Sequence, residues 1–116
     1  MIFNKYEFES QAAWDIAKQT LYITEILDEE EVRYLRPEVN SVVEIGHICL
    51  LWGEDNCENL STTWAVDILW NESSDRLSAN LVYPKPNAQV HTFSGDRDLY
   101  LQSYCLEFPD SPYCKL

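Results

Sequence analysis

The stretch TTWAVDILWN, residues 62–71, decides the fold of this 116-residue chain. With the two-residue period of a strand, one face carries the large apolar residues Trp64, Val66, Ile68 and Trp70. The other face carries Ala65, Leu69 and a single carboxylate, Asp67. Two tryptophans that bracket two β-branched residues form a surface that another element must cover. We therefore predict a central antiparallel strand whose heavier face meets a helix or a partner.

The segment after Ser10 supplies a helix for this face. Trp14, Ala17 and Leu21 recur at helical spacing, and the Ser10 hydroxyl is placed to accept a hydrogen bond from the first helical turn. We predict a helix at about residues 10–22, preceded by an edge strand or lead-in at residues 2–8. We assign structural roles to Trp14, Trp64, Asp67 and Trp70.

Residues 23–41 admit two interpretations. Asp28 followed by Glu31 resembles a capping box for a short helix that ends before Pro37. Alternatively, the sequences YITEIL and VRYL form two strands joined by an acidic turn. Both interpretations remain open at this point.

Residues 42–52 are rich in β-branched side chains and are interrupted by Gly46. An isolated glycine in a strand pattern indicates a bulge or a close backbone approach. Because a polar turn follows, we expect this strand to pair with residues 62–71 in a wide hairpin.

The C-terminal third predicts a strand at residues 79–84 and a helix that Ser94 caps and Pro109 ends. The predicted fold class is α+β: a small, three- to four-stranded, mainly antiparallel sheet with an N-terminal helix packed on one face and a C-terminal helix. Residues 1–116 are expected to form a single domain, with residues 96–116 as a C-terminal helical extension.

The formal net charge of −12, from 20 acidic and 8 basic residues, bounds the choice of partner. A field of this sign repels phosphate backbones and anionic lipids, so we expect neither direct nucleic-acid binding nor membrane binding. The same charge suits a basic protein partner, and it also suits imitation of a nucleic acid.

The four cysteines raise the question of compartment. We find no secretory signal pattern and no run of 18 apolar residues, so we expect a cytoplasmic chain with reduced thiols. Cys49 and Cys105 are then interpreted as buried small apolar residues. Disulfides remain the alternative, either Cys105–Cys114, which would close the C-terminal turn, or Cys49–Cys57.

Catalytic and metal-binding patterns are weak. His47 and Cys49 share a strand face, but the gaps between the four cysteines, of 7, 47 and 8 residues, lack the paired spacing of structural zinc sites. Cys49 or Cys57 combines on paper with His47 or His91 as nucleophile and base, without any recognisable catalytic motif. We expect a non-enzyme without metal or cofactor.

The carboxylates receive structural interpretations. The acidic runs at residues 28–31 and 54–58 are typical of solvated faces. Asp67 interrupts an apolar strand, and a buried carboxylate must be paired or hydrogen-bonded. If this face is buried, we expect Arg76, Arg97 or His91 to supply the partner of Asp67. If the face is solvated, Asp67 needs no partner.

Four phrases together resemble small uncharacterised proteins of tailed phages that are encoded among virion genes. These are an IG-containing segment at residues 44–48, WAVDILW, the turn LVYPKPN and the phrase VHTFSG, within about residues 10–95. Residues 96–116 extend past the point where such chains are expected to end. The resemblance implies a small, rigid virion or assembly component that works through protein contacts, and it transfers no catalytic residues.

We therefore expect a non-enzymatic phage virion accessory, structural or assembly protein, located in the virion, with an oligomeric state set by the assembly. Tyrosine is enriched at interfaces, and acidic residues suit a basic partner. The candidate partner-binding residues are Tyr83, Tyr100, Tyr104, Tyr113, Glu29, Glu30 and Glu31. The alternative is an acidic, nucleic-acid-mimicking inhibitor of a host defence enzyme, of the anti-restriction or anti-CRISPR type.

Overall fold

The computed structural model describes residues 1–84 and 97–114 of the chain, which have an α+β architecture. A four-stranded antiparallel sheet is accompanied by two separate two-stranded hairpins. The strands are β1 (Ile2–Phe8), β2 (Tyr22–Leu27), β3 (Glu30–Leu35), β4 (Val39–Gly46), β5 (Cys49–Trp52), β6 (Cys57–Leu60), β7 (Trp64–Trp70) and β8 (Leu81–Val82). The helices are α1 (Gln11–Lys18) and α2 (Arg97–Glu107), with 3-10 turns η1 (Gln19–Leu21), η2 (Ser78–Asn80) and η3 (Pro112–Cys114).

The main sheet has the strand order β4-β7-β1-β8, with β7 paired on both sides. The predicted pairing of residues 42–52 with residues 62–71 is confirmed only for the part that lies in β4, up to Gly46. Residues 49–52 instead form β5, which pairs with β6, so the prediction of one continuous strand is wrong. β1 runs antiparallel to β7 from Ile2 opposite Trp70 to Phe8 opposite Trp64. The prediction that residues 2–8 form an edge strand or lead-in is wrong. β1 is interior because β8, although short, pairs with its other side at Lys5 and Tyr6.

One face of the sheet packs with α1. Trp14, Val66, Ile68 and Trp70 are all buried in one core cluster, which also contains Tyr6. The cluster is tied together by a hydrogen bond of 3.0 Å in which the Trp70 indole N–H donates to the Tyr6 hydroxyl. The Ser10 hydroxyl caps α1 by accepting from the Ala13 backbone N–H at 3.1 Å, which satisfies a donor that the first turn leaves free.

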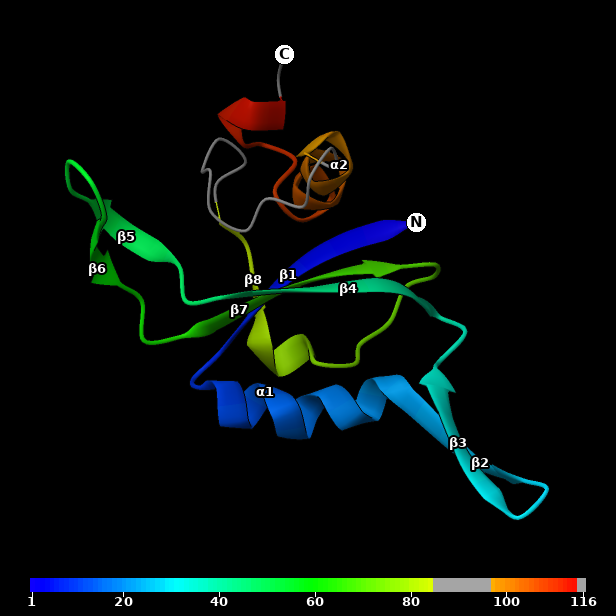
Figure 1. Cartoon of the computed structure of the whole chain (residues 1–116). Helices are drawn as coiled ribbons and strands as arrows, with labels where there is room; N and C mark the ends of the chain where they lie inside the picture. Colours follow the sequence, from blue (N-terminus) through cyan, green and yellow to red (C-terminus); the bar gives the residue numbers. More distant parts are fainter. Residues whose placement is uncertain (85–96, 115–116) are drawn as a thin grey trace.

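The opposite face packs with α2. Phe3 of β1 and Leu69 of β7 form a second core cluster with Tyr100 and Tyr104 of α2. Figure 1 shows α1 and α2 on opposite sides of the sheet, so both faces of β7 are covered. Ser94, the expected cap of this helix, lies outside the described residues.

The segment from 22 to 35 is a hairpin, as the second of the two interpretations has it. β2 and β3 are joined by Asp28 and Glu29, both with positive φ (52° and 68°), as a two-residue hairpin turn of the I′ kind requires. A second hairpin, β5–β6, is inserted between β4 and β7. Figure 1 shows the two hairpins projecting at opposite ends of a molecule that measures 53 × 35 × 24 Å.

The expectation of reduced thiols is wrong for this structure. Cys49 is bonded to Cys57 and Cys105 to Cys114, with Cα–Cα distances of 5.8 and 5.7 Å. The local turns bring each pair within bonding reach, a proximity that sequence spacing alone does not reveal. Among the described residues, no helix is both long and apolar enough to cross a membrane.

Candidate protein-binding surface

The hairpin β5–β6, residues 49–60, exposes large apolar side chains and is called here the clasped arm. Trp52 is 71% exposed, Leu50 is 64% exposed, and Leu51 and Leu60 are each 56% exposed. Exposed apolar residues are common singly, whereas a concentration of them on one projecting element marks an interaction site. A tryptophan among them adds the side chain most enriched at binding hot spots.

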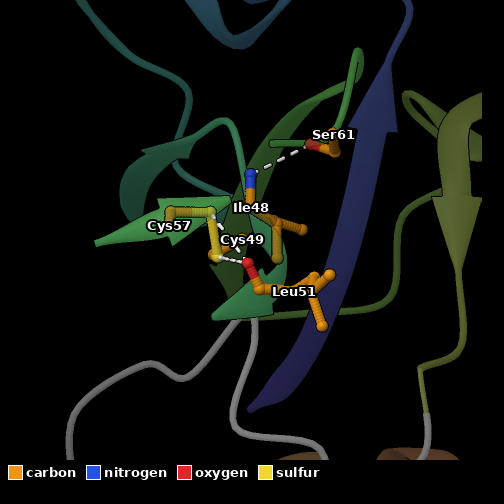
Figure 2. Close-up of a disulfide and its surroundings, with 5 residues drawn as sticks. All are labelled: Ile48, Cys49, Leu51, Cys57 and Ser61. Carbon is orange, nitrogen blue, oxygen red and sulfur yellow. Dashed lines mark hydrogen bonds between the residues drawn. A yellow bond between two sulfur atoms is a disulfide. The ribbon is translucent and has the colours of Figure 1, made fainter. Parts of the chain in front are cut away.

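The Cys49–Cys57 disulfide joins the two strands of this arm. Figure 2 shows the bond beside the Leu51 carbonyl oxygen, which lies 3.2 Å from Cys49 Sγ and 3.7 Å from Cys57 Sγ. Because an isolated two-stranded hairpin is only marginally stable in water, the cross-link is what we expect to keep this arm folded. The Gly53 N–H also donates to the Asn56 carbonyl at 2.8 Å and closes the tip.

The base of the arm is fixed to the main sheet by hydrogen bonds. The Ile48 N–H donates to Ser61 Oγ at 2.9 Å, and the Ser61 N–H donates to the Ile48 carbonyl at 2.7 Å (the first of these is drawn in Figure 2). The Ser61 hydroxyl donates in turn to the Thr63 carbonyl at 3.1 Å. Since Ile48 is itself buried, the arm leaves the body of the protein in a defined direction.

Gly46 sets the bend from which the arm begins. It has φ 88° and lies at a register shift between β4 and β7, so the predicted bulge is confirmed. The alternative of a close backbone approach is not observed, because the nearest atoms to a Cβ at this position would be side-chain ring carbons of Trp64, at 3.4 Å and beyond. The Trp64 ring also contacts His47 edge-on, with ring centroids 5.2 Å apart.

Charge accompanies the apolar residues on the arm. Glu54, Asp55 and Glu58 are all exposed, and residues 48–63 contain no lysine or arginine. The arm therefore combines exposed apolar side chains with exposed carboxylates. A complementary surface is an apolar groove bordered by basic residues.

The tyrosines proposed as partner contacts lie elsewhere. Tyr100 and Tyr104 are 4% and 9% exposed and pack in the second core cluster, so little of either ring is accessible at the surface. Tyr83 and Tyr113 are partly buried against the same cluster. Burial raises the pKa of Tyr100, and its hydroxyl donates to the Pro84 carbonyl at 2.6 Å. The spacing of Tyr100, Tyr104 and Phe108 at i, i+4 and i+8 was the sequence signal for one packed helix face.

The acidic candidates Glu29, Glu30 and Glu31 are exposed at the tip of the other hairpin, β2–β3. Figure 1 shows this hairpin away from both α2, which carries Tyr100 and Tyr104, and the clasped arm. The sequence did not single out residues 50–52 because a run such as CLLW is equally typical of a buried strand. The available signal was this apolar run directly before a polar turn, with a cysteine on either side.

Asp67 is fully buried and forms an ion pair with Lys5, whose Nζ lies 3.2 Å from Asp67 Oδ2. Lys5 is its cross-strand neighbour on β1. The expectation of Arg76 as partner is wrong, since Arg76 Nε donates to Glu38 at 3.1 Å. The other two expected partners, His91 and the side chain of Arg97, lie outside the described residues.

His47, Cys49 and Cys57 are the described residues that the sequence offered for metal binding or nucleophilic catalysis. In the part of the chain that the structure describes, no group of three or more His, Cys, Asp and Glu is arranged to hold a metal ion. His47 Nδ1 lies 3.0 Å from the Thr63 carbonyl, and both neighbouring cysteines are consumed in the disulfide. Neither Cys49 nor Cys57 therefore has a free thiol that could act as a nucleophile beside His47 in this structure.

Comparisons with protein-family models, with curated proteins and with solved structures find no match to this chain.

Proposed function

We propose that this chain is a non-enzymatic, protein-binding component of a phage particle or of its assembly, and that it docks through the clasped arm. The observation that carries the proposal is the concentration of exposed apolar side chains, Leu50, Leu51, Trp52 and Leu60, on one cross-linked projection. A rigid apolar projection loses little conformational entropy on binding, which favours affinity.

The placement in a particle is supported by two features. WAVDILW, LVYPKPN and VHTFSG resemble phrases of small tailed-phage proteins. The two disulfides also suit a protein that functions outside a reducing cytoplasm, and virion surfaces are among the places where disulfides persist. The bonds would then form after release of the particle from the host.

The alternative function, an acidic inhibitor that imitates nucleic acid, is motivated by the net charge of −12. A nucleic-acid mimic needs carboxylates spaced like phosphates along one surface. On the clasped arm the carboxylates instead border apolar residues, which are unfavourable in a site built for a phosphate backbone. We therefore favour docking to a protein surface.

Quantitative mass spectrometry of purified particles tests the proposal. We expect the chain at a fixed ratio to the major particle proteins, retained after washing in high salt because apolar contacts dominate. The absence of the chain from particles, combined with tight and salt-sensitive binding to a host nuclease, would instead establish the inhibitor. A particle preparation with the gene deleted serves as the control for contamination.

A further inference from the structure

The second hairpin, β2–β3, has the same general character as the clasped arm but stands at the other end of the molecule. Its two strands pair only with each other in the described structure, from Tyr22 opposite Leu35 to Leu27 opposite Glu30. It is therefore a free ribbon beyond the main sheet. We call it the acidic arm, residues 22–35.

The acidic arm also exposes large apolar side chains. Ile26 is 78% exposed and Leu27 is 53% exposed, and Val32 and Tyr34 are exposed on the opposing strand. Nothing in the described core reaches these positions. The strand register places Leu27, Val32 and Tyr34 on one face of the ribbon and Ile26 on the other. The ribbon therefore presents apolar side chains on both faces, as an element that enters a groove does.

The charges on this arm indicate the kind of partner. Its carboxylates are Glu25, Asp28, Glu29, Glu30 and Glu31. The one cation in residues 22–35, Arg33, lies over the Tyr22 ring at 4.2 Å. A second copy of this chain would bring like charges together, both on this arm and on the clasped arm. Charge complementarity therefore favours a basic partner surface.

The acidic arm is held in a fixed direction from its base. Tyr22 and Leu35 pack against the first core cluster. The backbone N–H of Arg36 donates to the Leu21 carbonyl, and its Nε donates to the Thr20 carbonyl, both at 2.9 Å. A direction fixed in this way limits the ordering cost of binding.

We propose that the acidic arm is a second docking element, so that this chain bridges two partner sites, each an apolar groove bordered by lysine or arginine. The inference rests on the proposed function of the clasped arm. Figure 1 shows the two arms pointing away from each other at opposite ends of the chain, whose longest dimension is 53 Å. They cannot enter the same groove, and two neighbouring subunits of a repeating assembly would supply the pair of sites.

If the chain bridges two sites, loss of one contact should lower its affinity for particles by a predictable factor. Two linked contacts strengthen binding by roughly 10²- to 10⁴-fold over one contact. The double variant Ile26→Ser and Leu27→Ser should therefore weaken binding to particles that lack the chain by about 10²-fold. Ile16→Ser is the matched control, because Ile16 is 71% exposed on α1 and lies on neither arm.

Site-specific photo-cross-linking decides the question. The photoreactive residue p-benzoylphenylalanine replaces Ile26 in one variant and Trp52 in another, and each purified chain is added to particles that lack it. We expect both positions to cross-link to particle proteins, and circular dichroism verifies that each variant is folded. Cross-linking from position 52 but not from position 26 would overturn the second arm and leave the proposed function standing. Cross-links from position 26 to another copy of this chain would overturn the basic partner, and none from either position would overturn the proposed function itself.

Discussion

At the scale of single residues, Lys5 and Asp67 form a charged pair buried within the core. Burial lowers the pKa of Lys5, and the Asp67 carboxylate opposes this shift by attraction and by its hydrogen bond. The Lys5 ammonium also lies 4.8 Å from the ring centres of both Phe3 and Tyr100, which stabilise its charge. The cation is thus held by a carboxylate and two aromatic faces.

Removal of either partner should destabilise the fold because it leaves the other charge buried. We expect Lys5→Met and Asp67→Asn each to lower the free energy of unfolding by about 3–5 kcal/mol. The double variant should lose clearly less than the sum of the two single losses. Urea unfolding of all four proteins measures this coupling, and strictly additive losses would refute it.

Glu44 is a carboxylate whose contacts make the stability of the fold depend on acid pH. The Trp14 indole N–H donates to it at 2.7 Å, and this bond, followed by Lys18 at 3.2 Å, holds the Glu44 pKa below its ordinary value of 4.5. A carboxyl whose folded pKa is lowered stabilises the fold fully above the unfolded pKa, and this contribution is lost as the pH falls through the folded pKa.

The variant Glu44→Gln keeps an acceptor for Trp14 but cannot ionise. Its free energy of unfolding should therefore fall less than that of the parent chain as the pH is lowered below 4.5. The difference should stay below about 1 kcal/mol, because solvent screens a group that is more than a third exposed. Parallel acid titrations of the two proteins that coincide would contradict this role.

Gly46 and Gly53 form a matched pair at the base and tip of the clasped arm. Gly46→Ala should cost about 1–3 kcal/mol, because its φ of 88° is unfavourable for any residue with a side chain. Gly53→Ala should cost less, about 0.5 kcal/mol, since Gly53 does not have a positive φ and the added carbon, which would lie 2.5 Å from Glu58 Oε1, displaces an exposed and flexible side chain. Thermal unfolding that ranks the two variants in the opposite order would be incompatible with the geometry.

At the scale of elements, we expect the Cys49–Cys57 disulfide to stabilise the clasped arm. In the variant Cys49→Ser with Cys57→Ser, we expect the free energy of local opening across residues 49–60 to fall by about 2–3 kcal/mol. Protection in β1 and β7 should persist. Hydrogen exchange measures both, with Cys105→Ser and Cys114→Ser as the matched control. Equal loss of protection over the whole sheet would show that the arm is not an independent element.

The sequence predicted elements better than it predicted their neighbours. Periodicity located β7 and the helical residues 11–21, because it reflects which side chains one element must bury. The pairing of β1 with Lys5 opposite Asp67, and the bonding of Cys49 to Cys57, depend on which segments meet, which period alone does not determine. The same limit explains why the sequence did not reveal the candidate site. Leu50, Leu51 and Trp52 have the composition of a buried strand, but in the fold they are exposed.

At the scale of the whole molecule, the main sheet and the two arms have different roles. Both faces of β7 are buried, so the sheet is a rigid support from which the arms project. The net charge of −12 guides such a chain toward a basic surface at long range, and the apolar residues of the arms then supply the short-range contact.

The most direct test of docking through the clasped arm is to measure how tightly the Trp52→Ser variant binds to particles that lack the chain. Trp52 is 71% exposed, so the substitution should leave the stability of the fold nearly unchanged, as should the control Ile16→Ser. We predict that Trp52→Ser weakens binding at least about 30-fold, the equivalent of a hot-spot loss of 2 kcal/mol. Ile16→Ser should bind like the parent chain. Equal binding of Trp52→Ser and the parent chain would contradict docking through the clasped arm.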